Sequence, residues 1–237
     1  VDLDIARGAI TGLIGPNGAG KSTLFGLIAG ENKPDAGTVR FAGLDITGQP
    51  PERVFRHGLA RTFQIPRPFR QMTVLENVMC AAPGQAGERF WNNWLRPGVV
   101  EAEEQALRER AGAVLEFTGL SHMRREAAAT LSGGQQKLLE LARVLMVGPK
   151  LILLDEPTAG VNPTLIETLI DKILALNADG ISFLIVEHNM DLVMRICSRI
   201  VVMAQGRRIF EGVPADVMRE QRVIDAYLGD IATEAES

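Results

Sequence analysis

The sequence predicts an α/β fold around a mostly parallel sheet. Three short apolar runs, at 9–14, 151–154 and 181–186, have the length and residue types of buried strands. A helical pattern at 23–29 follows the first run, and another at 163–176 connects the second to the third. Strands that alternate with helices pair in parallel, and 237 residues suit one large α/β domain covering residues 1–237.

A nucleotide site is predicted between the first strand and the first helix, where the chain reads GPNGAGKST. Glycines at this spacing let backbone N–H groups turn toward phosphate oxygens, Lys21 places a charge between the β and γ phosphates, and the Ser22 hydroxyl is placed to bind Mg²⁺. A glycine turn without this role is disfavoured because the strand and the helix that a true phosphate loop needs are both present. The predicted contacts are Gly15, Pro16, Asn17, Gly18, Ala19, Gly20, Lys21, Ser22 and Thr23.

Composition and charge disfavour several other classes of function. With 46% hydrophobic and 23% charged residues and a formal net charge of −4, the chain has no field that would gather nucleic acid. Cys80 and Cys197 are too few for a disulfide framework and lack metal-ligand spacing, which favours reduced structural thiols in a cytosolic setting. No apolar run reaches membrane-spanning length, so a membrane role is expected only through a partner.

Because Asp2 and Asp4 appear at once, we expect no basic and apolar signal segment at the N-terminus. A nucleotide site usually has an apolar surface for the base, yet no aromatic residue precedes Phe25. We therefore expect that Val1 is not the natural start and that the first strand region is missing.

Residues 38–64 predict two short strands and a helix. Thr38–Phe41 and Arg61–Gln64 have strand patterns, and Pro50 and Pro51 open a short helix that ends at Arg56. The prolines at 66 and 68 cannot continue a sheet, so Gln64 lies where a strand passes into a loop. Taken alone, Gln64 would be interpreted as a surface glutamine.

A separate helical lobe is predicted at approximately 65–147, because the segment is too long for one crossover between parallel strands. Thr73–Cys80 predicts a helix with a capping box between Thr73 and Glu76, and Glu101–Phe117 predicts a second helix. Between them, residues 83–98 predict a loop whose three large aromatic residues could cover a core or a partner; these are Phe90, Trp91 and Trp94.

The sequence LSGGQ at 131–135 opens an amphipathic helix. A serine and two glycines at a helix start leave N–H groups available to an anion, but the same residues also make an ordinary N-cap, and the pentapeptide does not decide between the two. The residues concerned are Ser132, Gly133, Gly134 and Gln135.

Two carboxylates, Asp155 and Glu156, follow the strand at 151–154 directly. Carboxylates at that place are costly unless they serve a cation or a proton, so we expect Asp155 to reach Mg²⁺ through water and Glu156 to polarise the water that attacks the γ phosphate. Capping of the next turn is the alternative. His188 ends the strand at 181–186 at the same edge as Glu156, which favours a γ-phosphate contact over a purely structural role.

The C-terminal part predicts a hairpin, with strands at 198–204 and 206–210 around Gln205 and Gly206. Short helices are expected near 215–219 and 223–228, and the acidic tail from Asp230 to Ser237 is expected to fray.

These motifs, in this order, resemble the nucleotide-binding subunit of ATP-binding cassette (ABC) transporters: GPNGAGKST, Gln64 after ARTF, LSGGQQ, LILLDEP and His188. The resemblance covers nearly the whole chain. It implies a P-loop NTPase core of the ABC ATPase type, an N-terminal antiparallel β part and an inserted α-helical subdomain. It further implies an ATP hydrolase in which Glu156, His188 and Lys21 act in catalysis, and a magnesium site formed by Ser22, Gln64 and Asp155.

The same resemblance implies partners. Two ATPase subunits, identical or homologous, would bind ATP between the phosphate loop of one chain and Ser132 to Gln135 of the other, which agrees with one phosphate loop but two anion-binding helix starts in each chain. Integral membrane permease subunits would dock beside Ile65 to Met79 at the cytoplasmic face of a bacterial or archaeal inner membrane. A solute-binding protein would act indirectly, and no nucleic acid is expected.

The segments TFQIPRPFRQMTVLENV, DEPTAGVNP, VEHNMDLVM and AYLG look more specifically like the ATPase subunits of branched-chain amino acid importers. Urea importers and the lipopolysaccharide export ATPase share much of this pattern. Asn162 stands where most of the wider family has an aspartate in the dimer-contacting loop. A soluble ABC ATPase that acts on DNA or ribosomes would usually have tandem cassettes, long coiled coils or basic surfaces, and a P-loop kinase would not need LSGGQQ.

Overall fold

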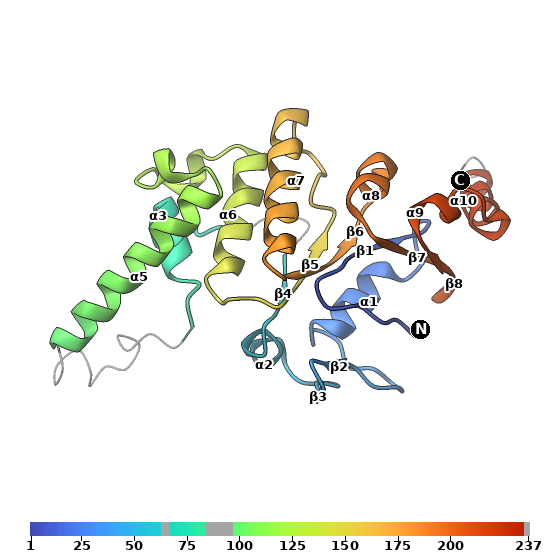
Figure 1. Cartoon of the computed structure of the whole chain (residues 1–237), viewed down its shortest axis with the longest axis horizontal. Coiled ribbons are helices and arrows are strands. Elements are labelled where there is room, and N and C mark those ends of the chain that lie inside the picture. Colours follow the sequence, from blue (N-terminus) through green and yellow to red (C-terminus); the bar gives the residue numbers. More distant parts are fainter. Residues whose placement is uncertain (63–66, 84–96, 235–237) are drawn as a thin grey trace. The chain divides into compact units, whose positions relative to one another are not determined.

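The architecture comes from a computed structural model that describes residues 1–62, 67–83 and 97–234. The chain forms two compact units that each combine separate stretches of sequence (Figure 1). The first unit contains Val1–Gln64, Lys150–Ala159 and Ile173–Ser237, and the second contains Ile65–Pro149 and Gly160–Lys172.

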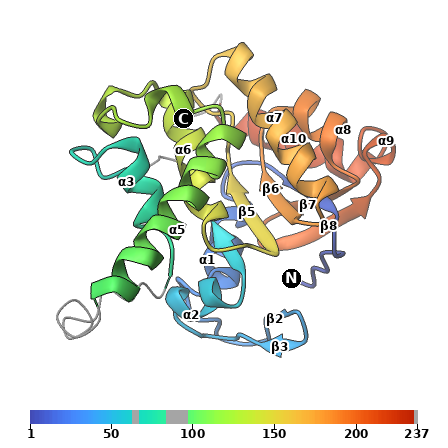
Figure 2. The same ribbon diagram turned by 60° about the vertical axis from the view of Figure 1, so that its left-hand side comes forward.

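The first unit is built on a six-stranded sheet in the order β4-β5-β6-β1-β7-β8. Four of these strands, β5, β6, β7 and β8, are labelled in Figure 2. Its strands are β1 (Ile10–Ile14), β4 (Leu59–Arg61), β5 (Leu151–Asp155), β6 (Ser182–Val186), β7 (Arg199–Ala204) and β8 (Arg207–Gly212). All neighbours pair in parallel except β7 and β8, which form an antiparallel hairpin. The predicted α/β class with a mostly parallel sheet is therefore confirmed.

The two faces of this sheet are covered by different helices. Leu13 of β1 packs into a buried cluster with Phe25 of α1 (Lys21–Ile28), whereas a Cβ added to the neighbouring Gly12 would meet Val193 of α8 (Met190–Ile196) at 3.1 Å. Because successive residues of a strand face opposite sides, α1 and α8 cover opposite faces. The strand β1 is therefore buried between helices on both faces, and the phosphate loop begins where this strand ends.

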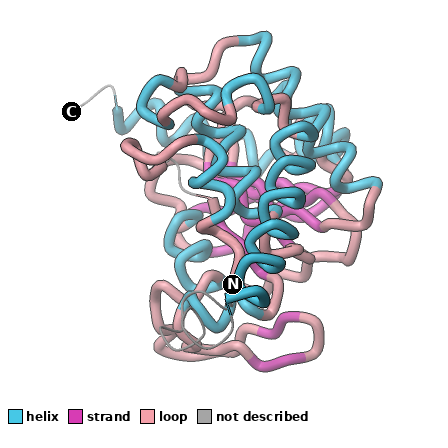
Figure 3. Tube along the Cα trace, turned by 90° about the vertical axis from the view of Figure 1, so that its left-hand side faces the viewer, coloured by secondary structure: helices cyan, strands magenta, loops and turns pink. Residues whose placement is uncertain are grey.

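The remaining elements of the first unit are short. A separate antiparallel pair, β2 (Arg40–Phe41) with β3 (Leu44–Asp45), precedes α2 (Pro51–Arg56) and is drawn in magenta apart from the main sheet in Figure 3. The C-terminal helices are α9 (Pro214–Val217) and α10 (Gln221–Glu234). The small antiparallel pair agrees with the expected antiparallel β part near the N-terminus.

The described elements of the second unit are helices. They are α3 (Val74–Met79), α5 (Pro97–Phe117), the short 3₁₀ turns η2 (Ser121–Met123) and η3 (Ala128–Thr130), and α6 (Gly133–Leu145), followed by the first part of α7 (Pro163–Ala178). The predicted capping box opens α3, with Thr73 accepting from the Glu76 N–H at 3.2 Å and Glu76 accepting from the Thr73 N–H at 2.7 Å. This cap is formed by residues three positions apart, whereas the N–H groups of Val74 and Leu75 donate to the distant carbonyl oxygens of Glu126 and Arg124.

Several boundaries differ from the sequence prediction, and the largest differences are in β4, α5 and α10. The edge strand β4 begins at Leu59 and ends at Arg61, because Leu59 and Ala60 are the buried residues that pair with β5. The helix α5 starts at Pro97 instead of Glu101, since proline is well suited to a first helical position. The helix α10 continues to Glu234, so the expected fraying from Asp230 is wrong for residues 230–234.

Several expectations lie outside the described residues. Gln64 and the three aromatic residues of the predicted loop, Phe90, Trp91 and Trp94, belong to this group. Within the described part of the chain, no helix is both long enough and apolar enough to cross a membrane.

Candidate functional site

The phosphate loop connects the buried end of β1 to the start of α1. Gly15 has a φ of 149°, and a Cβ added there would lie 2.0 Å from the Met203 carbonyl oxygen of β7. Only glycine allows two backbones to approach so closely. The N-cap of α1 is Gly20, in the left-handed region at φ 96°, and no side chain caps the helix. No side chain therefore occupies this helix end, and a helix N-terminus of this kind is suited to an anionic ligand.

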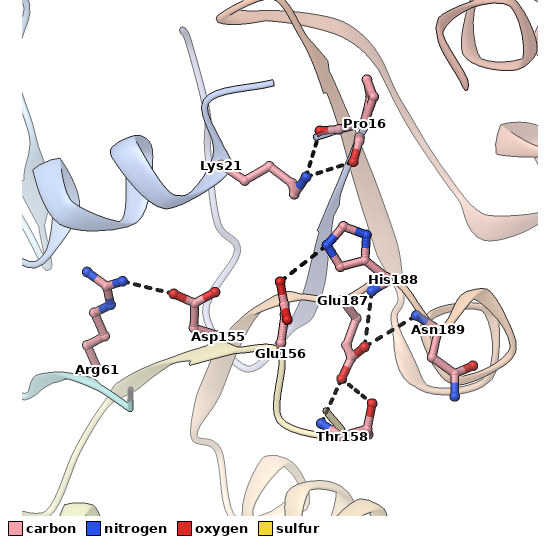
Figure 4. Close-up of polar contacts among 10 residues, drawn as sticks. Pro16, Lys21, Arg61, Asp155, Glu156, Thr158, Glu187, His188 and Asn189 are labelled. Atoms are coloured by element: carbon pink, nitrogen blue, oxygen red, sulfur yellow. Dashed lines mark hydrogen bonds and ion pairs between the residues drawn. The ribbon is translucent and has the colours of Figure 1, made fainter. Parts of the chain in front are cut away.

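Lys21 begins α1 and folds back over the loop. Its ammonium donates hydrogen bonds to the carbonyl oxygens of Gly15 at 2.7 Å and Pro16 at 2.9 Å, and the residue is 7% exposed (Figure 4). Ser22 and Thr23 follow on the exposed side of the first helical turn. A positive charge, uncapped N–H groups and a hydroxyl thus meet at one helix end, which is the donor set that a polyphosphate with its metal ion requires.

Asp155 ends β5 and forms a buried ion pair. Its Oδ2 accepts from the guanidinium of Arg61, the last residue of β4, at 2.8 Å, and the other terminal nitrogen of Arg61 donates to Glu31 at 2.5 Å. The Arg61 Cζ atom also lies 5.7 Å from the centre of the Phe25 ring. The sequence analysis did not identify Arg61 as a site residue. Its signal in the sequence was weak: a positively charged residue in a predicted strand, with no indication that this strand pairs with the one that ends in Asp155.

Glu156 and His188 lie together at the carboxyl ends of β5 and β6 (Figure 4). Glu156 Oε1 is 3.3 Å from His188 Nε2. The backbone of Glu156 has a φ of 47°, a conformation uncommon outside glycine, and its N–H donates to the Val186 carbonyl oxygen at 2.9 Å. This unusual conformation is held at a residue next to the predicted chemistry, as strained residues in active sites often are.

Glu187 is a second residue that the sequence did not single out. It is 4% exposed, and its carboxylate accepts hydrogen bonds from Thr158 and from the backbone at the start of α8. Burial first, and the Glu187 charge second, raise the pKa of the Cys197 thiol to about 12. Cys197 therefore keeps its proton at neutral pH, as a structural thiol does.

The LSGGQ segment starts α6 in the second unit. Ser132 is the N-cap: its hydroxyl accepts from the Gln135 N–H at 3.4 Å, and the Gln135 side chain accepts from the Ser132 N–H at 2.9 Å. Gly133 is exposed, with its nearest neighbour 3.8 Å from an added Cβ, whereas a Cβ at Gly134 would lie 2.5 Å from Leu165. Ser132 thus acts as the N-cap of α6, which was one of the two interpretations of this segment. The exposed Gly133 still leaves room for a ligand.

Asn162 precedes α7, and its Oδ1 accepts from the Leu165 N–H at 2.9 Å. Asparagine and aspartate cap helices about equally well. Asn162 therefore serves as well as an aspartate would at the start of α7.

A sequence profile of the ABC transporter family matches residues 1–159. The chain belongs to the ABC transporter family. A second profile, that of the branched-chain amino acid ATP-binding cassette transporters, matches residues 207–233, which contain β8 and most of α10. This ABC protein is thus an ATP-binding subunit, and its phosphate loop lies within the first match.

Curated relatives match the ABC protein over nearly its full length. A probable branched-chain amino acid transport ATP-binding protein LivG of Archaeoglobus fulgidus is 43% identical, covering 100% of this chain and 91% of that protein. The high-affinity branched-chain amino acid transport ATP-binding protein LivG of Escherichia coli is 39% identical, covering 97% and 91%. An ADP-bound ATP-binding cassette of an ABC transporter has a TM-score of 0.82 at 40% identity and covers 97% of this chain and 91% of its own.

Proposed function

We propose that this ABC protein hydrolyses ATP and thereby drives import of branched-chain or related amino acids. The observation that carries hydrolysis is the 3.3 Å contact between Glu156 and His188 at the sheet edge that also holds Asp155. The proposed solute rests on the relatives named above and on the C-terminal match at residues 207–233.

The residues at the phosphate loop fit a magnesium nucleotide. Lys21 and the uncapped N–H groups of α1 would hold the phosphates, and the Ser22 hydroxyl would bind the metal. Asp155 fits the same role, since among the described residues only its Oδ2 has a partner and Oδ1 remains available. Mg²⁺ supplies charge neutralisation when it is bound. The expected contribution of Gln64 lies outside the described residues.

Glu156 and His188 divide the remaining work. Glu156 is proposed to polarise the attacking water, and His188 to contact the γ phosphate and to hold the Glu156 carboxylate in place through Nε2. Phosphoryl transfer needs positioning and charge stabilisation more than covalent chemistry, and these two residues are suited to positioning the water and the γ phosphate.

A second ATPase subunit is proposed to complete the site. Ser132 to Gln135 lie at a helix start with an exposed glycine, and a related cassette with a TM-score of 0.74 at 25% identity has been solved as a dimer bound to ADP and phosphate. Membrane permease subunits would dock beside Ile65 to Met79, which places the protein at the cytoplasmic face of the inner membrane.

Replacement of Glu156 by glutamine tests hydrolysis. We expect Glu156→Gln to lower phosphate release by at least about 100-fold while ATP binding stays within about twofold, because the shape is kept and the base is lost. Glu116→Gln, on the exposed side of α5, is the matched control. Near-normal hydrolysis by Glu156→Gln would reject the assignment, and transfer of the γ phosphate to a substrate instead of water would indicate a kinase.

Reconstitution tests the solute. The chain is co-purified with its membrane subunits and with the solute-binding protein that activates them, and uptake of leucine and of urea into vesicles is compared. ATP-dependent leucine uptake supports the proposal. Uptake of urea alone, or extraction of lipopolysaccharide, would replace it by one of the two alternative transporters.

A further inference from the structure

The Glu187 carboxylate connects two parts of the candidate site, although the proposed chemistry does not use it. One oxygen, Oε1, accepts from the Thr158 hydroxyl at 2.6 Å and from the Thr158 N–H at 2.9 Å. The other, Oε2, accepts from the N–H groups of His188 at 3.1 Å and Asn189 at 3.3 Å (Figure 4). Each oxygen therefore binds a different segment.

These two segments are the ones that carry Glu156 and His188. Thr158 lies two residues after Glu156 in the turn that leaves β5, and His188 follows Glu187 directly where β6 passes into α8. The contact of Glu156 with His188 is a further side-chain link between the two segments. The Glu187 carboxylate thus holds the bases of both side chains at a set separation.

A carboxylate suits this place better than its neutral analogue. All four groups around it are donors, and a glutamine would turn its NH₂ group toward two of them. A charge at 4% exposure is costly to bury unless hydrogen bonds satisfy it. The four hydrogen bonds offset this cost only while both segments stay in place.

We propose that Glu187 is a positioning residue for hydrolysis: it keeps Glu156 and His188 within contact distance of each other. The proposal rests on the proposed ATPase function. It adds a residue that touches neither the nucleotide nor the water and acts through the geometry of two residues that do.

The test compares Glu187→Gln with Glu211→Gln in the full chain assembled with its partners. Glu211 is a partly buried carboxylate of β8 in the same unit. It forms an ion pair with Arg199, with 2.8 Å between Oε1 and Nε, and it is remote in sequence from both catalytic segments. We expect Glu187→Gln to lower kcat by about 10- to 100-fold with KM for ATP within about twofold, since small displacements of catalytic groups cost that much. Glu211→Gln should change the melting temperature but leave kcat unchanged.

Two further variants distinguish positioning from general stability. Adding Glu187→Gln to His188→Ala should lower kcat by less than about twofold, because the effect acts through His188. Thr158→Val removes the 2.6 Å hydrogen bond without touching the carboxylate, and it should lower kcat by about 3- to 10-fold. This milder variant keeps the test decisive if Glu187→Gln does not fold.

Other outcomes would overturn the inference. One is a wild-type kcat in Glu187→Gln or, if that variant does not fold, in Thr158→Val. The other is a double variant in which the losses of kcat from Glu187→Gln and His188→Ala multiply. Failure of the ATPase proposal would look different, because the wild-type complex would then release no phosphate and Glu156→Gln would change nothing.

Discussion

The starts of α1 and α6 are both glycine-rich helix N-termini, but only the start of α6 is capped by a side chain. The α1 helix begins after Gly20 without a side-chain cap and has the Lys21 ammonium folded over its loop. The α6 helix begins after Ser132 with a complete capping box. No side chain of the protein caps the first end, whereas the second end satisfies part of its own N–H groups.

This difference indicates two kinds of anion site. The end of α1 combines uncapped N–H groups with a buried cation, so it can bind phosphate within one chain. The end of α6 is stable without a ligand, and a phosphate there must share donors with Ser132 and Gln135. Such a site is suited to closing over a nucleotide that is already held elsewhere.

Glycine-to-alanine replacements should separate the two ends most strongly. In Gly15→Ala the new Cβ would lie 2.0 Å from the Met203 carbonyl, and we expect a loss of about 3 kcal/mol or more in unfolding free energy. In Gly133→Ala the nearest atom is 3.8 Å away, so the loss should stay within about 0.5 kcal/mol. Urea denaturation measures both, and equal losses would remove the distinction.

Two arginines extend the comparison to the rest of each unit. Arg61 lies over Phe25 and pairs with two carboxylates, while Arg143 of α6 lies 5.3 Å from the centre of the Phe69 ring and donates to the Arg67 carbonyl oxygen. Arg61→Met should cost about 3 kcal/mol because it leaves buried Asp155 unpaired.

Arg143→Met, which strands no charge, should cost about 1 kcal/mol. Thermal or urea unfolding of the two variants measures both losses of unfolding free energy. A smaller loss for Arg61→Met than for Arg143→Met would mean that the ion pair of Asp155 adds nothing to stability.

Removal of the Lys21 charge tests the α1 end as a single-chain site. Lys21→Met should weaken ATP binding by about 30- to 100-fold, in line with about 2–3 kcal/mol for hydrogen bonds to a charged group. Isothermal titration of the isolated chain gives the affinity. Lys150→Met, an exposed lysine just before β5, is the control and should bind as the wild type does.

Loss of the Ser132 cap should have the smallest effect on the isolated chain. Ser132→Ala should cost about 1 kcal/mol of stability, as the loss of an N-cap usually does. ATP affinity of the single chain should not change, whereas hydrolysis by the assembled pair should fall. If the single chain loses affinity as well, the α6 end belongs to the same chain's site and the comparison fails.

The parts of the fold that depend on neighbouring residues could be predicted from the sequence. Both capping boxes, at Thr73 and Ser132, involve a side chain and a backbone group three residues apart, and both are recognisable as short patterns. The strands β1, β5 and β6 could also be predicted from their apolar runs, because strands buried on both faces have few polar residues. Strand β4 begins two residues and ends three residues before the predicted positions, since its bounds depend on pairing with β5.

By itself the sequence determined the phosphate loop, the carboxylates after β5 and the histidine after β6, because each motif combines residue types whose chemistry requires one another at short spacing. Only the tertiary structure decided the roles of Arg61 and Glu187. Arg61 reaches Asp155 across 94 positions of sequence, and Glu187 reaches Thr158 across 29. A buried charge must find its partners in space, and those contacts exist only after the strands have assembled into one sheet.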